Sequence, residues 1–262
     1  MQEIINLNRY PLDREGSAEW KALVEQSAAE LEATGMFNLE EFILPGIAQK
    51  AAAEIAPLMA TQSYAHKRAH NIYFLPDIPG LAPDHPALRK VETINHTICA
   101  DQIPDSLVLS IYTYAPLARF LAATMGKPSL HTMADPLARA NVMAYRQGEA
   151  LNWHFDRSEF TTTLLLQEPE QGGVFEYRTD LRSPNDPNYA GVAQLLEGRD
   201  PEVQRNGLKA GTLNVFRGKN TAHRVTPVQG NVDRMIAVFS YYERPGVLFT
   251  TQERIGFYGR AG

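Results

Sequence analysis

From Ala140 onwards the chain is divided into short stretches whose alternation of apolar and polar residues is typical of β-strands. Each stretch is bounded by Gly, Pro, Asn or Asp, residues that favour turns. In chain order the stretches are NVMAYRQG, LNWHFDR, EFTTTLLLQ, GGVFEYR, GTLNVFRG, HRVTPV and RMIAVFSYYE. Strands of this length and spacing fit a sandwich or jelly roll, in which two sheets enclose a cavity that can hold a ligand.

The residues before Ala140 show helical spacing instead. Over residues 17–34 apolar side chains recur at helical intervals, Ser17 can cap the start, and Gly35 can end the helix. Further helices are expected over residues 46–59 and 106–125, the second broken or kinked at Pro116.

Two other segments before Ala140 are not expected to be helical. Residues 36–44 are predicted to form a short strand. Residues 64–86 contain prolines at 76, 79, 83 and 86 and are predicted to form a long ordered loop. The expected fold class is therefore α+β, with a double-stranded β-helix (jelly roll) core over residues 140–262. The mainly helical residues 1–139 would pack against this core and form one catalytic domain with it.

Composition and charge exclude several classes of partner. The 262 residues are 44% hydrophobic and carry a formal net charge of -5 without a block of Lys or Arg, which argues against nucleic acid and anionic membranes as partners. The single cysteine, Cys99, cannot form an internal disulfide, and the opening residues lack the pattern of a signal peptide. We expect a cytoplasmic protein that acts on a small molecule, with a homodimer as a possible state.

A candidate metal site is formed by His154, Asp156 and His223. Residues two apart in a strand point to the same face, so His154 and Asp156 would present an imidazole and a carboxylate together. Folding of the second half of the core could bring His223 beside them. Two histidines and one carboxylate leave about three coordination positions open, which suits iron(II) in an oxygenase. The alternative is that these residues serve surface or capping roles.

Arg234 is a candidate for binding an anion. In the strand DRMIAVFSY it shares one face with Ile236 and Val238, and an arginine on an apolar face needs an anionic partner. A guanidinium matches a carboxylate through two parallel hydrogen bonds. The alternative is a structural ion pair with Asp233 or Glu243.

The segments YRQGEALNWHFDRSEFTTTLLLQEPEQGGVFEY and LKAGTLNVFRGKNTAHRVTPVQGNVDRMIAVFSYYE resemble the 2-oxoglutarate- and iron(II)-dependent dioxygenase superfamily. The likeness is to its prolyl-hydroxylase-like pattern and rests on Tyr145, Gly148, Leu151, His154 and Asp156, continued by Gly172, Gly173, Gly211, His223, Pro227, Val228 and Gly230. It implies that Fe(II), 2-oxoglutarate and O2 are used to hydroxylate an unactivated C–H bond, with release of succinate and CO2. Arg234 would bind the distal carboxylate of 2-oxoglutarate.

Outside the core, the segments HNIYFLPDIPGLAPDHPALRK, MADPLARANVMAY, RSPNDPNYAGV and ERIGFYGR are similar to a bacterial subgroup of free-amino-acid halogenases and hydroxylases, notably those acting on lysine. In those halogenases glycine replaces the carboxylate ligand so that chloride can bind iron. Because Asp156 is kept, the resemblance implies a hydroxylase. The substrate it implies is a free amino acid such as lysine.

Several other residues are candidates for the site, each with a structural alternative. Asn141, Tyr145 and Thr163 would face the cavity and contact the cosubstrate, or else serve as buried, satisfied polar groups. Glu149, Asn152 and Arg157 flank the metal strand and could bind the substrate, or else lie on the solvated surface.

The sequence is also compatible with two other functions. One is a protein or peptide side-chain hydroxylase of prolyl-hydroxylase type, with an open groove formed by the long loop and the insertion at residues 180–206. The other is a non-catalytic jelly roll that binds a small molecule.

Overall fold

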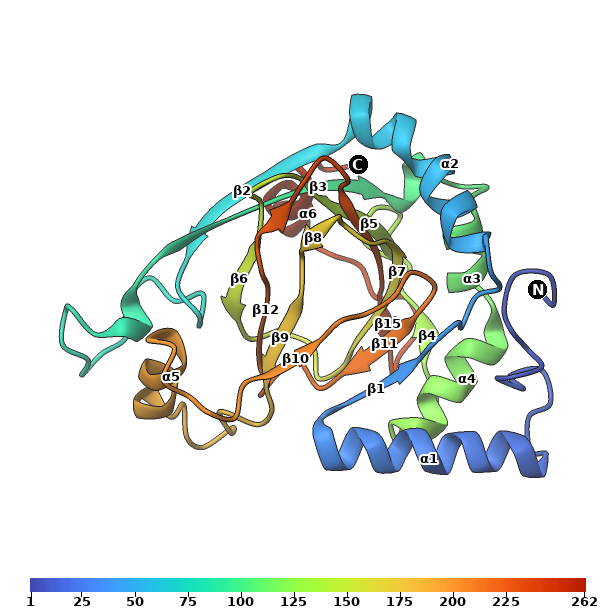
Figure 1. The fold of residues 1–262 in the computed structure, drawn as a ribbon, viewed down its shortest axis with the longest axis horizontal. Helices are drawn as coiled ribbons and strands as arrows, with labels where there is room; N and C mark the ends of the chain where they lie inside the picture. Colours follow the sequence, from blue (N-terminus) through green and yellow to red (C-terminus); the bar gives the residue numbers. More distant parts are fainter.

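Two antiparallel β-sheets face each other in the computed structural model, which describes residues 1–262 (Figure 1). In order across the sheet, the larger one consists of β1 (Met36–Leu39), β11 (Leu213–Phe216), β7 (Thr161–Gln167), β14 (Arg234–Phe239), β5 (Ala140–Tyr145), β3 (Val91–Cys99) and β2 (Tyr64–His70). The smaller one consists of β10 (Gln204–Asn206), β9 (Phe175–Arg178), β12 (Ala222–Val225) and β6 (Leu151–His154). Two short ladders join β8 (Gln171–Gly172) to β13 (Val228–Gln229) and β4 (His131–Thr132) to β15 (Tyr241–Tyr242). The expected α+β fold with a jelly-roll core is confirmed.

The helices lie mainly along the larger sheet. They are α1 (Ala18–Thr34), α2 (Ile47–Gln62), α3 (Leu107–Tyr112), α4 (Ala115–Thr124), α5 (Tyr189–Leu196) and α6 (Thr251–Tyr258), with two 3-10 turns at Pro86–Leu88 and Ala100–Gln102. Figure 1 shows α1 to α4 gathered on the side of β1, β7 and β11, whereas α5 lies on the opposite side, near β6 and β10. No helix combines the length and the apolar character that a membrane span requires.

The predicted helices form where their capping residues indicate. The side chain of Ser17 accepts a hydrogen bond from the Trp20 amide at the start of α1, and Gly35 ends the helix with φ of 76°. The segment 106–125 is broken as expected, although one turn earlier than Pro116. Helix α3 ends before Thr113, and Pro116 lies in the first turn of α4, where a missing amide hydrogen is tolerated.

The prediction of a loop over residues 64–86 is wrong for residues 64–70. Residues Tyr64–His70 form β2, which pairs with β3 along its whole length and is the edge strand of the larger sheet. The sequence YAHKRAH gives little signal for a strand because β2 is an edge strand and most of its residues are exposed. The irregular segment that remains runs from Asn71 to His85.

The two faces of the larger sheet have different chemistry. Its outer face packs on the helices in a cluster of 34 buried residues that extends from Ile5 to Phe239 and includes Met235 and Ala237 of β14. On the inner face, Ile236 belongs to a second cluster with Tyr145 and Leu165. Because side chains alternate along a strand, Arg234 also points inwards, between the sheets.

Candidate metal centre

Three side chains that can bind a metal meet between the sheets. In the pairing of β6 with β12, His154 lies opposite His223, and Asp156 follows two residues after the first histidine. One ligand atom from each residue lies within 4.8 Å of the others. The Nε2 atoms of His154 and His223 are each 3.4 Å from Oδ1 of Asp156. The sequence-predicted set is therefore brought together.

Backbone carbonyl groups orient both imidazoles. Nδ1 of His154 lies 2.8 Å from the Asn152 oxygen, and Nδ1 of His223 lies 3.0 Å from the Thr221 oxygen. A carbonyl oxygen only accepts hydrogen bonds, so each Nδ1 carries the hydrogen and each Nε2 offers a lone pair to a metal. Burial, aided by the neighbouring His223, lowers the pKa of His154, which keeps this ring neutral. Neutral imidazole is the form that binds metals.

One hydrogen bond holds the carboxylate of Asp156, and a second one fixes its backbone. The Thr161 hydroxyl donates to Oδ2 at 2.6 Å, and the Asp156 amide donates to the Gly218 oxygen at 3.0 Å. Gly218 also leaves room for the side chain, because a Cβ atom there would lie 2.2 Å from Oδ2. Burial alone would raise the pKa of Asp156, but the imidazoles of His223 and His154 outweigh it and hold that pKa well below its usual range.

This donor set fits iron(II). Two neutral imidazoles and one carboxylate on one side of an ion form the 2-His-1-carboxylate arrangement, which leaves positions open for further ligands. His154 and His223 are 6% and 2% exposed, so a bound ion would be shielded from bulk water.

Arg234 is buried between the sheets with some of its guanidinium hydrogens unpaired. The residue is 2% exposed, its Nε donates to the Gly173 oxygen at 3.0 Å, and its Nη1 has no hydrogen-bond partner. Burial lowers the pKa of Arg234 to about 10, so the group is still a cation at neutral pH. Burying a cation with an unpaired donor costs free energy, which an anionic ligand would offset.

The structural alternative for Arg234 is contradicted. The carboxylate of Asp233 lies near Arg146, and that of Glu243 pairs with Lys127, so neither neutralises Arg234. Instead Arg234 lies opposite Tyr145 in the pairing of β14 with β5. Burial raises the pKa of Tyr145 to about 12, so its hydroxyl remains protonated beside the guanidinium. A cavity of about 200 Å³, whose lining includes Arg234, Leu165 and Phe175, adjoins this pair.

Asn141 and Thr163 also point between the sheets, where their side chains have partners within the protein. Nδ2 of Asn141 donates to the Leu137 oxygen at 2.8 Å, and its Oδ1 accepts from the Tyr258 hydroxyl at 3.0 Å. The Thr163 hydroxyl donates weakly, at 3.5 Å, to Asn214. The amide of Asn141 is therefore less available to a ligand than the side chains of Tyr145 and Arg234.

The three residues expected to bind the substrate lie at different depths. Glu149 accepts from His96 at 3.0 Å and from the Arg146 amide at 2.8 Å. The side chain of Arg157 is 73% exposed and pairs with Glu253 of α6. Asn152 lies next to the metal centre, because its carbonyl oxygen orients His154.

Sequence reasoning missed two residues that shape the centre. Gly218 contacts Asp156 only in the tertiary structure, so the residues around it in the sequence do not indicate a role in the metal centre. His70 packs edge-on against His154 with ring centroids 6.3 Å apart. No local pattern indicates it, because most of β2 is exposed and β3 places polar side chains on its inner face, so neither strand shows the apolar alternation of a buried strand.

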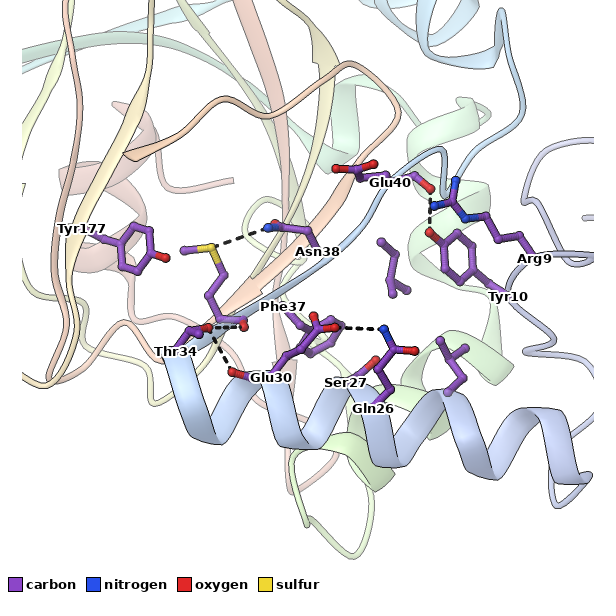
Figure 2. Close-up of a pocket in the computed structure, with 13 residues that line it drawn as sticks. Arg9, Tyr10, Gln26, Ser27, Glu30, Thr34, Phe37, Asn38, Glu40 and Tyr177 are labelled. Carbon is purple, nitrogen blue, oxygen red and sulfur yellow. Dashed lines mark hydrogen bonds between the residues drawn. The ribbon is translucent and has the colours of Figure 1, made fainter. Parts of the chain in front are cut away.

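A larger cavity, of about 600 Å³, lies away from the metal donors, between α1, β1 and β9. Figure 2 shows that several polar groups on its wall bond to one another, including Gln26 to Glu30 at 2.9 Å and Tyr10 to the Glu40 oxygen at 2.6 Å. None of the three metal donors lines it.

Comparison with solved structures agrees with this architecture. A 2OG-Fe(II) oxygenase family oxidoreductase from Burkholderia pseudomallei matches with a TM-score of 0.51 and 17% identity, over 89% of this chain and 94% of that one. A prolyl-4-hydroxylase from Pseudomonas putida gives 0.50 and 15%, over 82% and 97%. A prolyl hydroxylase from Trichoplax adhaerens, in complex with a peptide of hypoxia inducible factor, gives 0.55 and 11%, over 88% and 96%.

The chain has the fold of 2OG-Fe(II) oxygenases, and the two histidines and one carboxylate between its sheets could hold a metal ion. A family model described as Halogenase D matches residues 19–248, and the chain belongs to that family. No curated protein matches the chain.

Proposed function

We propose that the protein hydroxylates an unactivated C–H bond of a free amino acid, with lysine as the first choice, using iron(II), 2-oxoglutarate and O2. One observation carries this proposal: Asp156 completes the donor set, at 3.4 Å from both Nε2 atoms. In the halogenases that the sequence resembles, glycine at this place leaves room for chloride. The family bears the name Halogenase D, but a chain with this carboxylate in place lacks that room.

The residues of the centre divide the work of binding. His154, Asp156 and His223 would hold the iron, while Arg234 and Tyr145 would bind the distal carboxylate of 2-oxoglutarate. The free Nη1 of Arg234 supports this role, because a guanidinium and a carboxylate form strong paired hydrogen bonds. When bound, iron(II) and 2-oxoglutarate would supply the oxidising chemistry, with succinate and CO2 as co-products. The buried walls would exclude water from the reacting carbon.

The placement of the loop and the insertion favours a small substrate. Residues Ile72 and Ala87 of the loop region pack with Leu181 and Val192 of the insertion on the outer side of the smaller sheet. The Tyr73 hydroxyl also donates to the Pro187 oxygen across this contact. Loop and insertion therefore cover one another, which argues against the open groove that a protein or peptide substrate would need.

A free cation near the centre favours an amino acid as substrate. The guanidinium of Arg68 lies 4.9 Å from the centre of the Phe74 ring, and that ring lies 5.9 Å from the ring of His154. Arg68 is exposed and forms no ion pair with the protein. It is available for the carboxylate of a substrate that enters from this side.

The direct test is to incubate the protein with iron(II), ascorbate and 2-oxoglutarate together with each member of a panel of free amino acids and peptides. We expect succinate formation to rise well above the background with a polar L-amino acid and to require iron. The Asp156→Ala variant serves as the inactive control. Stronger stimulation by peptides would favour the protein hydroxylase, and no iron-dependent succinate at all would favour a non-catalytic binding protein.

A further inference from the structure

His70, the last residue of β2, contacts the metal centre without being able to join it. Its ring is 6% exposed and packs edge-on against His154. Both of its nitrogens are already used: Nδ1 lies 3.0 Å from the Asn71 oxygen, and Nε2 lies 2.9 Å from Oγ1 of Thr93. His70 is therefore a neighbour of the donor set and not a fourth ligand.

These partners fix the direction of the hydrogen bonds around His70. The Asn71 carbonyl can only accept, so Nδ1 carries the hydrogen and Nε2 of the neutral ring accepts the hydroxyl hydrogen of Thr93. The oxygen of Thr93 is then free to accept, and the backbone amide of Asn152 donates to it at 3.2 Å, with the side-chain Nδ2 of Asn152 at 3.4 Å. Each donor in this series of hydrogen bonds is therefore paired with an acceptor.

The series ends on a metal donor. The carbonyl oxygen of Asn152 accepts from Nδ1 of His154 at 2.8 Å. Hydrogen bonds thus run from His70 through Thr93 and Asn152 to His154, and they cross from the larger sheet to β6 of the smaller sheet. Strand β6 is an edge strand, paired only with β12. Thr93 supplies the contact that a neighbouring strand would otherwise give to the Asn152 amide.

The ring of His70 is itself held in place. Phe74 stacks on it with centroids 4.2 Å apart and an angle of 19° between the planes, while also packing edge-on against His154. Phe74 has φ of 57°, an uncommon value for a residue other than glycine. The backbone conformation that places Phe74 here is therefore maintained by the surrounding contacts.

We propose that His70 and Thr93 are positioning residues for the metal ligand His154: they fix the Asn152 backbone, which in turn aims Nε2 of His154 at the ion. This inference rests on the proposed iron-dependent function. Partners that orient a ligating histidine in this way typically change metal affinity by about 10- to 100-fold when they are lost.

The test compares two threonines of β3 that point to the same face. Thr93→Val removes the hydroxyl that links His70 to Asn152. Thr97→Val removes an equally buried hydroxyl, which donates only to Asn95 at 3.0 Å. Thr93→Ser keeps the hydroxyl and should rescue binding. Cobalt(II) is the probe, because its absorption spectrum reports the geometry of its ligands and its binding is measured without turnover.

We expect Thr93→Val to weaken cobalt(II) binding about tenfold or more and to change the spectrum, while Thr97→Val and Thr93→Ser stay close to the parent protein. Equal affinities and equal spectra for Thr93→Val and Thr97→Val would overturn the positioning role. If Thr93→Val does not fold, His70→Phe, which keeps the ring stack, should weaken binding to the same extent, and an unchanged affinity would again overturn it. A parent protein that binds no cobalt(II) or iron(II) would instead overturn the proposed function.

Discussion

Gly218 lies so close to Asp156 that a Cβ atom at residue 218 would come within 2.2 Å of Oδ2 and 2.8 Å of Cγ. The carboxylate of Asp156 therefore occupies the space in which a side chain at residue 218 would lie. Gly218 does not have a positive φ angle, so glycine is needed here for space and not for backbone conformation. The position of a metal donor thus depends on a glycine that is distant in the sequence.

Gly218→Ala should displace the Asp156 carboxylate and weaken iron(II) or cobalt(II) binding by about tenfold or more, as loss of a supporting contact does. The fold should remain, which circular dichroism would check. Gly256→Ala is a matched control, because a Cβ atom there meets no atom within 4 Å. Equal metal affinity of the two variants would show that Asp156 does not need this space.

Removal of a metal donor should abolish stabilisation by the metal. A ligand that binds only the folded protein raises its stability in proportion to the logarithm of the ligand concentration over Kd. We expect saturating cobalt(II) to raise the melting temperature of the parent protein, and to have little effect on His154→Ala, Asp156→Ala or His223→Ala. Two variants that kept the full metal-induced shift would contradict the assignment of the centre.

Arg234→Met should raise the KM for 2-oxoglutarate by roughly 10- to 100-fold, which corresponds to a charge-assisted hydrogen bond of about 1.5 to 3 kcal/mol. The free energy of unfolding without ligands should fall by only about 1 to 3 kcal/mol, because the substitution removes the hydrogen bond from Nε to the Gly173 oxygen while Nη1 has no partner to lose. Steady-state kinetics and thermal unfolding separate the two effects. An unchanged KM together with a large loss of stability would make Arg234 a structural residue.

Asp135 should stabilise the protein at neutral pH and make its stability sensitive to acid. The residue is fully buried, and its carboxylate accepts from the amides of Leu137, Ala138 and Phe249 and pairs with Arg254. Burial opposes ionisation, but these partners outweigh it and lower the pKa of Asp135 below 3.8. A lowered pKa in the folded state contributes stability that is present above the pKa of the unfolded chain and is lost as pH falls through the folded pKa.

Asp135→Asn should therefore lower the free energy of unfolding at neutral pH by about 1.5 to 3 kcal/mol, the size of a hydrogen bond to a charged group. Denaturant unfolding at several pH values would measure this. The difference from the parent protein should shrink as the pH falls below 3.8, the usual pKa of an aspartate. A difference that stayed constant down to acidic pH would show that the charge of Asp135 is not involved.

The sequence predicts the jelly-roll strands after Ala140 and the pair His154 and Asp156 because both depend on local spacing. His154 and Asp156 share a face by alternation along one strand, and His223 meets them through the pairing of β6 with β12. The inward direction of Arg234 follows from the same alternation, on a strand whose other face is apolar.

The remaining features depend on tertiary structure. Strand β3 places Thr93, Asn95 and Thr97 on its inner face, where they line the site. Because these inward residues are polar, the sequence of β3 lacks the alternation of apolar and polar residues by which a strand is recognised. The amide of Asn141 points inwards as expected. Its hydrogen bonds to Leu137 and to Tyr258 of α6 depend on the tertiary structure and could not be predicted from the sequence. The contact of Gly218 with Asp156 likewise has no counterpart in local sequence.

The central claim is that the protein hydroxylates its substrate at a centre that retains Asp156. The most direct test measures the mass of the product formed in chloride-rich, iron-replete buffer under ¹⁸O₂. The parent protein is incubated with 2-oxoglutarate and the free amino acid that best stimulates succinate formation. We predict a product that has gained one oxygen atom derived from O2, formed together with succinate, and without the isotope pattern of chlorine. A product that is mainly chlorinated would contradict the account.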